Sequence, residues 1–293
     1  MSFPRRRESI AIAVWIPASA GMTSEKRFIM INIIFQRLKE QYRSVLIYTA
    51  ALIAYALLMI SIFPTIQKMD LQALMASYPK ELAKFFSSSG IETYSTIEGY
   101  MAMEYLSMFF VIIIVFYIGS AAGSAIAGTI EKRTMDFNLS QPVSRSKLVL
   151  AEAAVAVKYS ALIVSLVSLS MFIFGQIFNT PFHAKGLVAF TVVAILFLWA
   201  LYGIAIFLSS ILRTKLSVVL LIFGFVMASF VFSSLTRIVE KIQHFDKISI
   251  FYLYNPEQLL KTGTINWNQA GILFLIFALG LSAAIVIFNK KDI

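Results

Sequence analysis

Long apolar runs recur along the 293-residue chain, and each could cross a bilayer as a helix. A helix satisfies its own backbone hydrogen bonds, which the interior of a membrane requires. The sequence therefore predicts an all-α integral membrane protein with six transmembrane helices, preceded by an amphipathic interfacial helix. The predicted spans cover residues 45–63, 105–127, 159–178, 187–212, 218–235 and 270–288.

The composition excludes the common soluble classes. Apolar residues make up 59% of the chain and charged residues 14%, whereas soluble domains contain about 25% charged residues. The mean hydropathy is +0.81. These values exclude an ordinary cytosolic enzyme, a disordered protein and a coiled coil. The absence of cysteine also excludes disulfides, thiolate zinc sites and a cysteine nucleophile.

The distribution of Lys and Arg predicts how the spans are oriented. The segments on one side carry 12 Lys and Arg against 5 acids, and those on the other side carry 8 against 8. Basic residues are enriched on the cytoplasmic side, so we expect both ends of the core to be cytoplasmic. We ascribe the net charge of +10 to this orientation and not to nucleic-acid binding. Aromatic residues in the second long outer loop, at 251–254, are expected in an interfacial belt.

Residues 1–29 differ from the rest of the chain. A basic start, a short apolar stretch and the run Pro17-Ala18-Ser19-Ala20 are typical of a signal peptide. Cleavage there would leave the new N-terminus outside, against the charge distribution. We therefore favour a spurious or non-structural extension that precedes the true start at Met30, over a genuine cytosolic tail or a signal peptide.

The residues after Met30 predict the amphipathic helix. The apolar residues that recur there at helical spacing are Ile31, Ile34, Phe35, Leu38 and Tyr42. The charged residues that lie largely off this stripe are Arg37, Lys39, Glu40 and Arg43. This pattern is typical of a helix in the inner membrane interface. The alternative is a plain cytosolic extension of the first span.

No catalytic or metal site can be recognised in the sequence. It lacks a glycine-rich phosphate-binding loop, so this chain is not expected to hydrolyse ATP. His183 and His244 stand alone in outer loops and are interpreted as solvated. Charges are nearly absent from the spans, which disfavours a proton- or sodium-coupled transporter. Glu152 lies at the inner edge of the third span, and Lys158 one turn further in can extend back to the interface.

Small residues are dense at the inner end of the second span. Gly119, Gly123 and Gly128 follow each other at nearly helical spacing. Such residues allow helix backbones to approach closely in lipid. The two interpretations are helix packing within the chain and a subunit contact or moving seam.

The inner segment 131–152 is amphipathic and basic. Met135, Phe137 and Leu139 give it an apolar face that a solvated loop does not need, which indicates a short helix that contacts a partner. Pro142 is expected to end this helix. Ser144 can cap the next helix, which we expect to begin at Arg145 and to continue into the third span.

This segment resembles the cytoplasmic coupling segment of ABC-2 type transporter permeases. The matching residues are Glu131, Thr134, Met135, Asp136, Leu139, Ser140, Pro142, Val143, Ser144 and Arg145. Arg133 stands where the family commonly has glycine. The C-terminal Phe288-Asn289-Lys290-Lys291-Asp292-Ile293 is similar to the family's closing Phe-x-Arg-Arg-Asp-Leu. The resemblance covers residues 30–293 as one six-span permease domain.

The resemblance implies the membrane-spanning permease subunit of an ATP-driven ABC transporter, without enzymatic activity or a cofactor of its own. Two permease copies, as a homodimer or a heterodimer, would work in the bacterial inner membrane with cytosolic ATPase subunits that bind the ATP. Export is the usual direction in this family. The residues implied to couple the ATPase to the spans are Glu131, Thr134, Met135, Asp136, Phe137, Leu139, Pro142 and Arg145.

Two other classes of function stay open on the sequence alone. One is a membrane scaffold or sensor that regulates a partner ATPase without transport. The other is an intramembrane lipid-modifying enzyme, which would need His, Asp or Glu clustered at an interface. Apolar spans with few charges fit lipids, hydrophobic drugs, peptides and antibiotics equally well as cargo.

Overall fold

The computed structural model describes residues 21–68, 94–133, 144–238 and 240–291, and these residues form helices and short connections without a strand. Within these residues, six helical segments are long and apolar enough to cross a membrane, which confirms the predicted all-α membrane fold. The six segments are Ile31–Gln67, Ile97–Ala125, Arg145–Ile177, Ala184–Ile211, Lys215–Thr236 and Trp267–Lys290.

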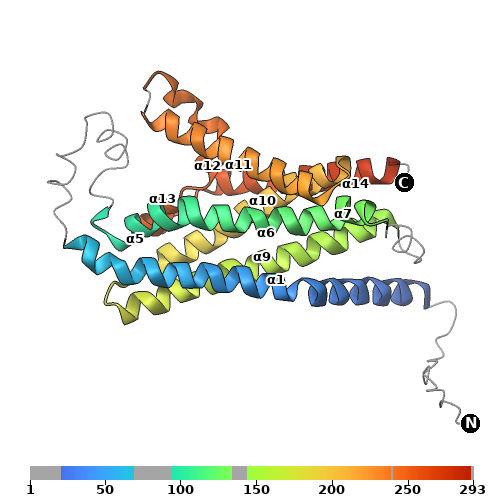
Figure 1. Ribbon diagram of the computed structural model, residues 1–293, viewed down its shortest axis with the longest axis horizontal. Helices are drawn as coiled ribbons and strands as arrows, with labels where there is room; N and C mark the ends of the chain where they lie inside the picture. The colour runs from blue at the N-terminus through green and yellow to red at the C-terminus, as the bar shows by residue number, and fades with distance from the viewer. Residues whose placement is uncertain (1–20, 69–93, 134–143, 239, 292–293) are drawn as a thin grey trace, which may run out of the picture.

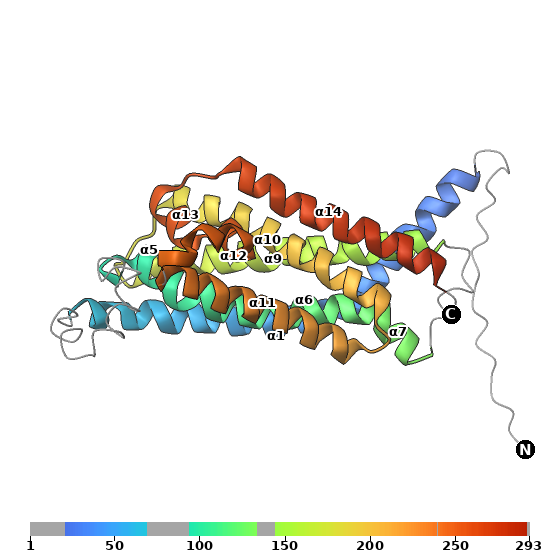
Figure 2. The ribbon, with the colours of Figure 1, turned by 90° about the horizontal axis from the view of Figure 1, so that it is seen from above.

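The spans lie side by side in an elongated bundle (Figure 1). Helix α10 packs against four other long helices and has a largely buried surface. Helix α1 pairs with α9, and α6 pairs with α11 (Figure 2). The long helices are α1 (Gly21–Gln67), α6 (Phe110–Ala125), α9 (Arg145–Ile177), α10 (Ala184–Ile211), α11 (Lys215–Ile238) and α14 (Trp267–Lys290).

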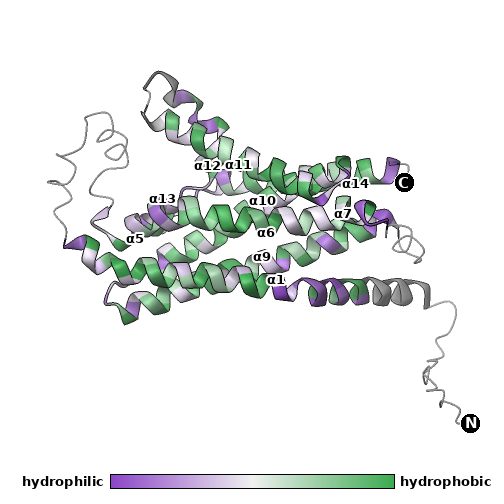
Figure 3. Cartoon of the chain, viewed as in Figure 1, coloured by the Kyte–Doolittle hydropathy of each residue, from purple (hydrophilic) through white to green (hydrophobic). Residues whose placement is uncertain are grey.

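Short helices occupy the two ends of the bundle. At one end lie the start of α1, the end of α14 and α7 (Ala127–Glu131); we call this the inner end (Figure 1). The opposite, outer end holds α5 (Ile97–Tyr100), η2 (Glu240–Ile248), α12 (Ile250–Leu253) and α13 (Pro256–Thr262). The π-helix η1 (Met101–Phe109) joins α5 to α6 within the second span. Hydrophilic residues concentrate toward the ends, and hydrophobic residues cover the middle (Figure 3).

The separate interfacial helix expected before the first span is not confirmed. Residues 30–43 belong to α1, which continues without a break into the first span. The residues of the predicted apolar stripe do not share one environment. Ile34 and Leu38 pack against the core, while Phe35 is 66% exposed. Arg37, expected off the stripe, turns toward α9 and forms an ion pair there. The packing partner of this part of α1 is therefore another helix of the chain.

Glycines allow two pairs of helices to approach closely. A Cβ atom on Gly280 of α14 would overlap the backbone of Gly203 in α10, so these two backbones are in direct contact. On the α6–α11 seam, a Cβ atom on Gly119 would lie 2.9 Å from Ile222 Cγ2. One on Gly123 would lie 3.1 Å from the carbonyl oxygen of Lys215. The small-residue face of the second span thus packs against the fifth span of the same chain.

The aromatic residues expected in an outer interfacial belt lie in the core instead. The chain between α11 and α14 turns back into the bundle, where Phe251 and Tyr254 are buried. The Tyr254 ring stacks on Phe197 of α10 with 4.3 Å between ring centroids. Its hydroxyl donates a hydrogen bond to the Leu106 carbonyl oxygen, 3.2 Å away. The buried phenol thus gains a polar partner in the π-helix, where backbone bonding departs from the α pattern.

Candidate coupling site and inner cavity

A break at the end of the second span places Glu131 beside the start of the fifth span. At Ile126 the backbone leaves α-helical geometry, and α7 begins at the next residue. The amide of Ala127 donates to Ser209 Oγ of α10 at 3.0 Å, which satisfies a group that the break frees. The short α7 then places Glu131 Oε2 2.9 Å from the backbone amide of Lys215. A carboxylate at this position complements the partial positive charge at the N-terminus of α11.

Arg145 fastens the start of α9 to the end of α14. Its Nη1 atom donates to the carbonyl oxygens of Phe288 at 3.1 Å and Lys291 at 2.6 Å. The guanidinium carbon also lies 5.6 Å from the centroid of the Phe288 ring. The last carbonyls of a helix lack partners within that helix and carry partial negative charge, so a partly buried cation satisfies them well. Ser146 and Asn289 add hydrogen bonds beside this contact, the shorter at 2.9 Å.

Lys291 makes a second contact of the same kind at the end of α10. Its Nζ atom donates to the carbonyl oxygens of three successive residues, Ser210, Ile211 and Leu212, at 2.9 to 3.3 Å. Burial and the nearby Arg213 lower the pKa of Lys291. The C-terminal motif therefore links the inner ends of α9, α10 and α14. Arg145 and the C-terminal motif, which the sequence presents as separate resemblances, form one contact in the structure.

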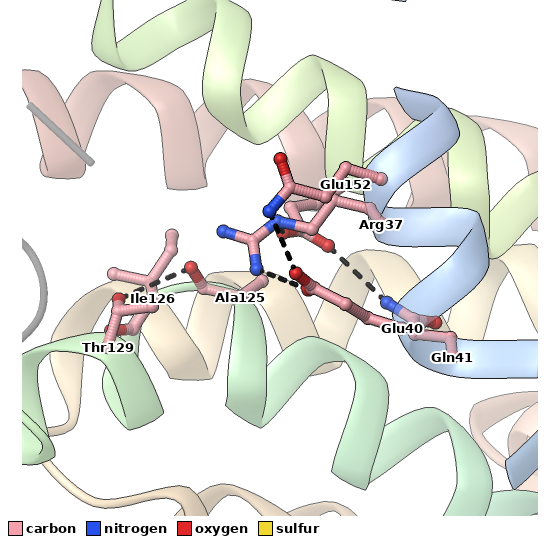
Figure 4. A network of polar contacts seen from close by, with 8 residues as sticks. Arg37, Glu40, Gln41, Ala125, Ile126, Thr129 and Glu152 are labelled. Atoms are coloured by element: carbon pink, nitrogen blue, oxygen red, sulfur yellow. Dashed lines mark hydrogen bonds and ion pairs between the residues drawn. The ribbon is translucent and has the colours of Figure 1, made fainter. Parts of the chain in front are cut away.

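An ion pair joins α1 to α9 at the same end of the bundle (Figure 4). Arg37 Nε lies 2.8 Å from Glu152 Oε1, and only 7% of the Glu152 side chain is exposed. Arg37 Nη1 also bonds Glu40 Oε2 at 2.8 Å. Gln41 Nε2 donates to Glu152 Oε2 at 3.5 Å. The buried carboxylate is thereby held by a cation and an amide, as a charge away from water requires.

Beside this network lies a cavity of about 920 Å³. Its walls come from α1 and α9 on one side and from α6, α7 and α11 on the other. The size falls in the range of small-molecule sites, which measure about 300–1,000 Å³. Two residues that line it, Gln41 and Tyr117, each have a buried polar atom, Oε1 and Oη, without a hydrogen-bond partner in the described part of the chain. The Tyr117 ring packs against Tyr48 with centroids 5.6 Å apart.

The predicted coupling residues are only partly described. Glu131 and Arg145 flank residues 134–143, and each is fixed to a different helix, α11 and α14. Ser144 is the residue before α9, as expected, but its side chain makes no capping hydrogen bond. The other predicted coupling residues, Thr134, Met135, Asp136, Phe137, Leu139 and Pro142, lie outside the described residues. Gly128 lies in α7, where an added Cβ would be 3.2 Å from the Gly123 carbonyl oxygen.

The Arg37–Glu152 pair was missed by sequence reasoning, although Glu152 was recognised at the edge of the third span. Glu152 is an acid in an otherwise apolar segment, and this was the signal that could have indicated a cationic partner within the bundle. At the outer end, His183 is exposed as expected, but its Nδ1 lies 2.8 Å from Glu98 Oε1, which is buried. No group of three His, Cys, Asp or Glu residues among those described could hold a metal ion.

The sequence from residue 23 to 293 matches the model of the ABC-2 family transporter proteins. The chain belongs to the ABC-2 transporter family. No curated protein matches the chain. Family membership over nearly the whole chain, together with six candidate spans, fits the permease subunit of a transporter. ABC-2 permeases are typically membrane subunits without enzymatic activity that work with an ATPase. The protein is accordingly a multi-pass membrane protein of this transport family.

Proposed function

We propose that this ABC-2 permease exports a hydrophobic or amphipathic substrate, using the energy of ATP hydrolysed by a separate cytosolic ATPase. The observation that carries the proposal is the anchoring of residues 131–145 at both ends. Glu131 bonds the first amide of α11, and Arg145 bonds the last carbonyls of α14. A partner that displaced this segment would move two spans directly.

The packing supports transmission of such a displacement into the bundle. Lys291, held through its carbonyl by Arg145, caps α10 through its side chain. Helix α11 contacts α6 closely at Gly119 and Gly123. Closely packed interfaces shift between discrete arrangements instead of deforming gradually. Motion at the inner end would therefore reach α11 and α14 directly, and α10 and α6 through these contacts.

The proposed location is the bacterial inner membrane, with the inner end of the bundle in the cytoplasm. The excess of Lys and Arg on this side supports the orientation. A transporter that draws on cytosolic ATP needs its coupling segment there. We further propose that two permease copies, identical or homologous, assemble with two ATPase subunits.

The decisive test is purification of the tagged protein from its native host in mild detergent, followed by mass spectrometry of what accompanies it. We expect a stoichiometric subunit with a phosphate-loop ATPase motif. A preparation without any ATPase, repeated after crosslinking in intact membranes, would contradict the proposal.

Glu131→Ala tests the coupling role within that complex. We expect the permease to fold and to lose no more than about 1 kcal/mol of stability, because the change removes one cap at a helix end. We also expect less substrate to be transported per ATP hydrolysed. Glu257→Ala, which removes a partly exposed acid at the outer end, is the matched control. Equal coupling in the two variants would remove Glu131 from the coupling path.

A further inference from the structure

A groove between α1 and α9 opens outward toward the inner end of the bundle. It has a volume of about 530 Å³. The least exposed residue of its lining is Tyr159, whose hydroxyl donates to the Leu38 carbonyl oxygen at 2.6 Å and so joins the two helices. Phe35 and Tyr42 also line the groove, and they are 66% and 42% exposed. The groove is therefore accessible from outside the bundle.

The groove carries positive charge without a counter-charge. Lys39 of α1 and Lys158 of α9 line it, both of them exposed, and no acid belongs to its lining. Neither lysine forms an ion pair with another residue that the structure describes. Glu40, which follows Lys39 in the sequence, is bonded to Arg37 instead. Two like charges at one groove repel each other, so an anion bound between them is stabilised.

Tyr42 adds a hydrogen-bond donor to the same groove. Its Oη atom accepts a hydrogen bond from Arg43 Nε at 3.1 Å, and the Arg43 guanidinium carbon lies 5.8 Å from the centroid of the Tyr42 ring. A phenol oxygen that accepts a hydrogen bond keeps its own O–H group to donate. Ammonium and phenol donors beside a further cation suit the oxygens of a phosphate group.

Both lysines lie where the spans leave the apolar interior of the membrane. Lys158 directly precedes the predicted third span, and Lys39 precedes the first by six residues, or about 9 Å of helix. Because Leu38 and Tyr159 are hydrogen-bonded, the residues that follow and precede them, Lys39 and Lys158, lie at a similar depth. Helix α1 changes from mostly hydrophilic to mostly hydrophobic residues toward the middle of the bundle (Figure 3). Lipid headgroups occupy this boundary of the hydrocarbon layer.

Exposed apolar side chains continue from the lysines toward the middle of the bundle. Leu46 follows Lys39 by seven residues and Leu162 follows Lys158 by four, so each leucine lies on the same face of its helix as the lysine. The two leucines are 62% and 43% exposed. The ligand that matches this surface has a negatively charged head and apolar chains.

From these features we infer that the groove between α1 and α9 binds an anionic phospholipid. The phosphate contacts Lys39, Lys158 and the Tyr42 hydroxyl, and the acyl chains follow Leu46 and Leu162. A zwitterionic phospholipid matches less well, because its ammonium brings a further positive charge to a groove without an acid. The inference goes beyond the proposed function, since it concerns a lipid of the surrounding membrane and not the transported substrate.

Native mass spectrometry of the purified full chain, without ATPase, tests the inference. The protein is offered phosphatidylglycerol and phosphatidylcholine of identical acyl chains in equal amounts. A lysine near the membrane surface favours an anionic lipid by about fivefold. With two lysines at the groove, we expect phosphatidylglycerol to be retained about 25-fold more than phosphatidylcholine.

Lys39→Gln and Lys158→Gln should each reduce this preference about fivefold, and the double variant should abolish it. The matched control is Lys185→Gln/Lys247→Gln, which removes two exposed lysines at the outer end and should keep the full preference. Thermal unfolding verifies that the variants fold, and the single variants carry the test if the double variant does not. Glycerophosphoglycerol, the same head without acyl chains, should be retained far less than the lipid.

Equal retention of the two lipids by the wild-type chain would overturn the inference. A loss of preference in the outer control as large as that in Lys39→Gln/Lys158→Gln would overturn it too, since net charge would then suffice. A dimer that binds neither lipid and dissociates in the groove variant would show that a second copy covers the groove, which also contradicts the inference. These measurements need no ATPase, so they succeed or fail independently of the proposed function.

Discussion

Replacement of Arg37 by methionine should destabilise the protein far more than loss of an ordinary ion pair. Methionine keeps an unbranched side chain of similar length but removes the charge. The Glu152 side chain, which is 7% exposed, then keeps its carboxylate buried with only the 3.5 Å contact to Gln41. The change therefore leaves a buried charge without compensation, which is the costly way to break an ion pair.

The expected magnitude follows from the exposure of the two contacts that Arg37 makes. Removal of one member of a fully buried pair costs about 3–5 kcal/mol. Arg37 is itself 22% exposed and borders the cavity, so the lower end of that range, about 3 kcal/mol, applies. The contact to Glu40 is solvent-exposed and contributes less than about 1 kcal/mol. In a chain of this size a loss of about 3 kcal/mol lowers the unfolding midpoint by roughly 6 °C.

Thermal unfolding of the full chain in mild detergent, followed by intrinsic fluorescence, measures the effect. The matched control is Lys261→Met, which breaks an ion pair of the same 2.8 Å length between two partly exposed side chains of α13 at the outer end. This control should shift the midpoint by about 1 °C or less. The double variant Arg37→Met/Glu152→Met should recover to within about 1 kcal/mol of the wild type, because neither charge is then left alone.

Two outcomes would refute this reasoning. A midpoint for Arg37→Met within 1 °C of that for Lys261→Met would show that water or another group solvates Glu152 fully. A double variant as unstable as Arg37→Met would show that the side chains matter through packing or hydrogen bonding and not through an uncompensated charge.

Three further variants test contacts elsewhere in the bundle, each by its unfolding midpoint. Gly123→Leu should lower the stability by about 1–3 kcal/mol, because the larger side chain overpacks against α11. The control Gly224→Leu, where an added Cβ meets nothing within 4 Å, should lower it less. Equal losses of stability would show that α6 and α11 are not tightly packed at Gly123. Arg145→Leu should cost about 2 kcal/mol through its bonds to the end of α14; recovery of less than half of this loss in Arg145→Lys would speak against a simple charge contact. Tyr254→Phe should cost about 1 kcal/mol through the bond to Leu106, and no change would show that this bond contributes nothing.

The sequence alone determined the membrane fold and the number of spans. Apolar length is a local property, since a run of residues long enough to cross a bilayer is recognisable without knowledge of its neighbours. The resemblance of the inner segment and the C-terminal motif also lies in contiguous residues. The ABC-2 family assignment, which the family match later showed, was accessible for the same reason.

The rotation of a helix about its axis and the identity of its packing partners could not be predicted from contiguous residues. Periodicity placed Arg37 on the polar side of an amphipathic helix, which was reasonable for a helix with lipid on one face and water on the other. In the structure that side meets α9, and the charge pairs with Glu152. Likewise Phe251 and Tyr254 have the composition of an interfacial belt, but the chain folds back and buries them.

Only the tertiary structure decided the partners at the inner end. Glu131, Arg145 and Lys291 each satisfy backbone groups at the end of a helix distant in sequence. Every helix leaves such groups unpaired, so a charged side chain near a span end has many possible partners. Bundle packing selects one of them, because only the helix whose end lies within a few ångströms can accept the contact. The sequence supplied the charges and the helix ends, and the packing of the spans determined which charge met which end.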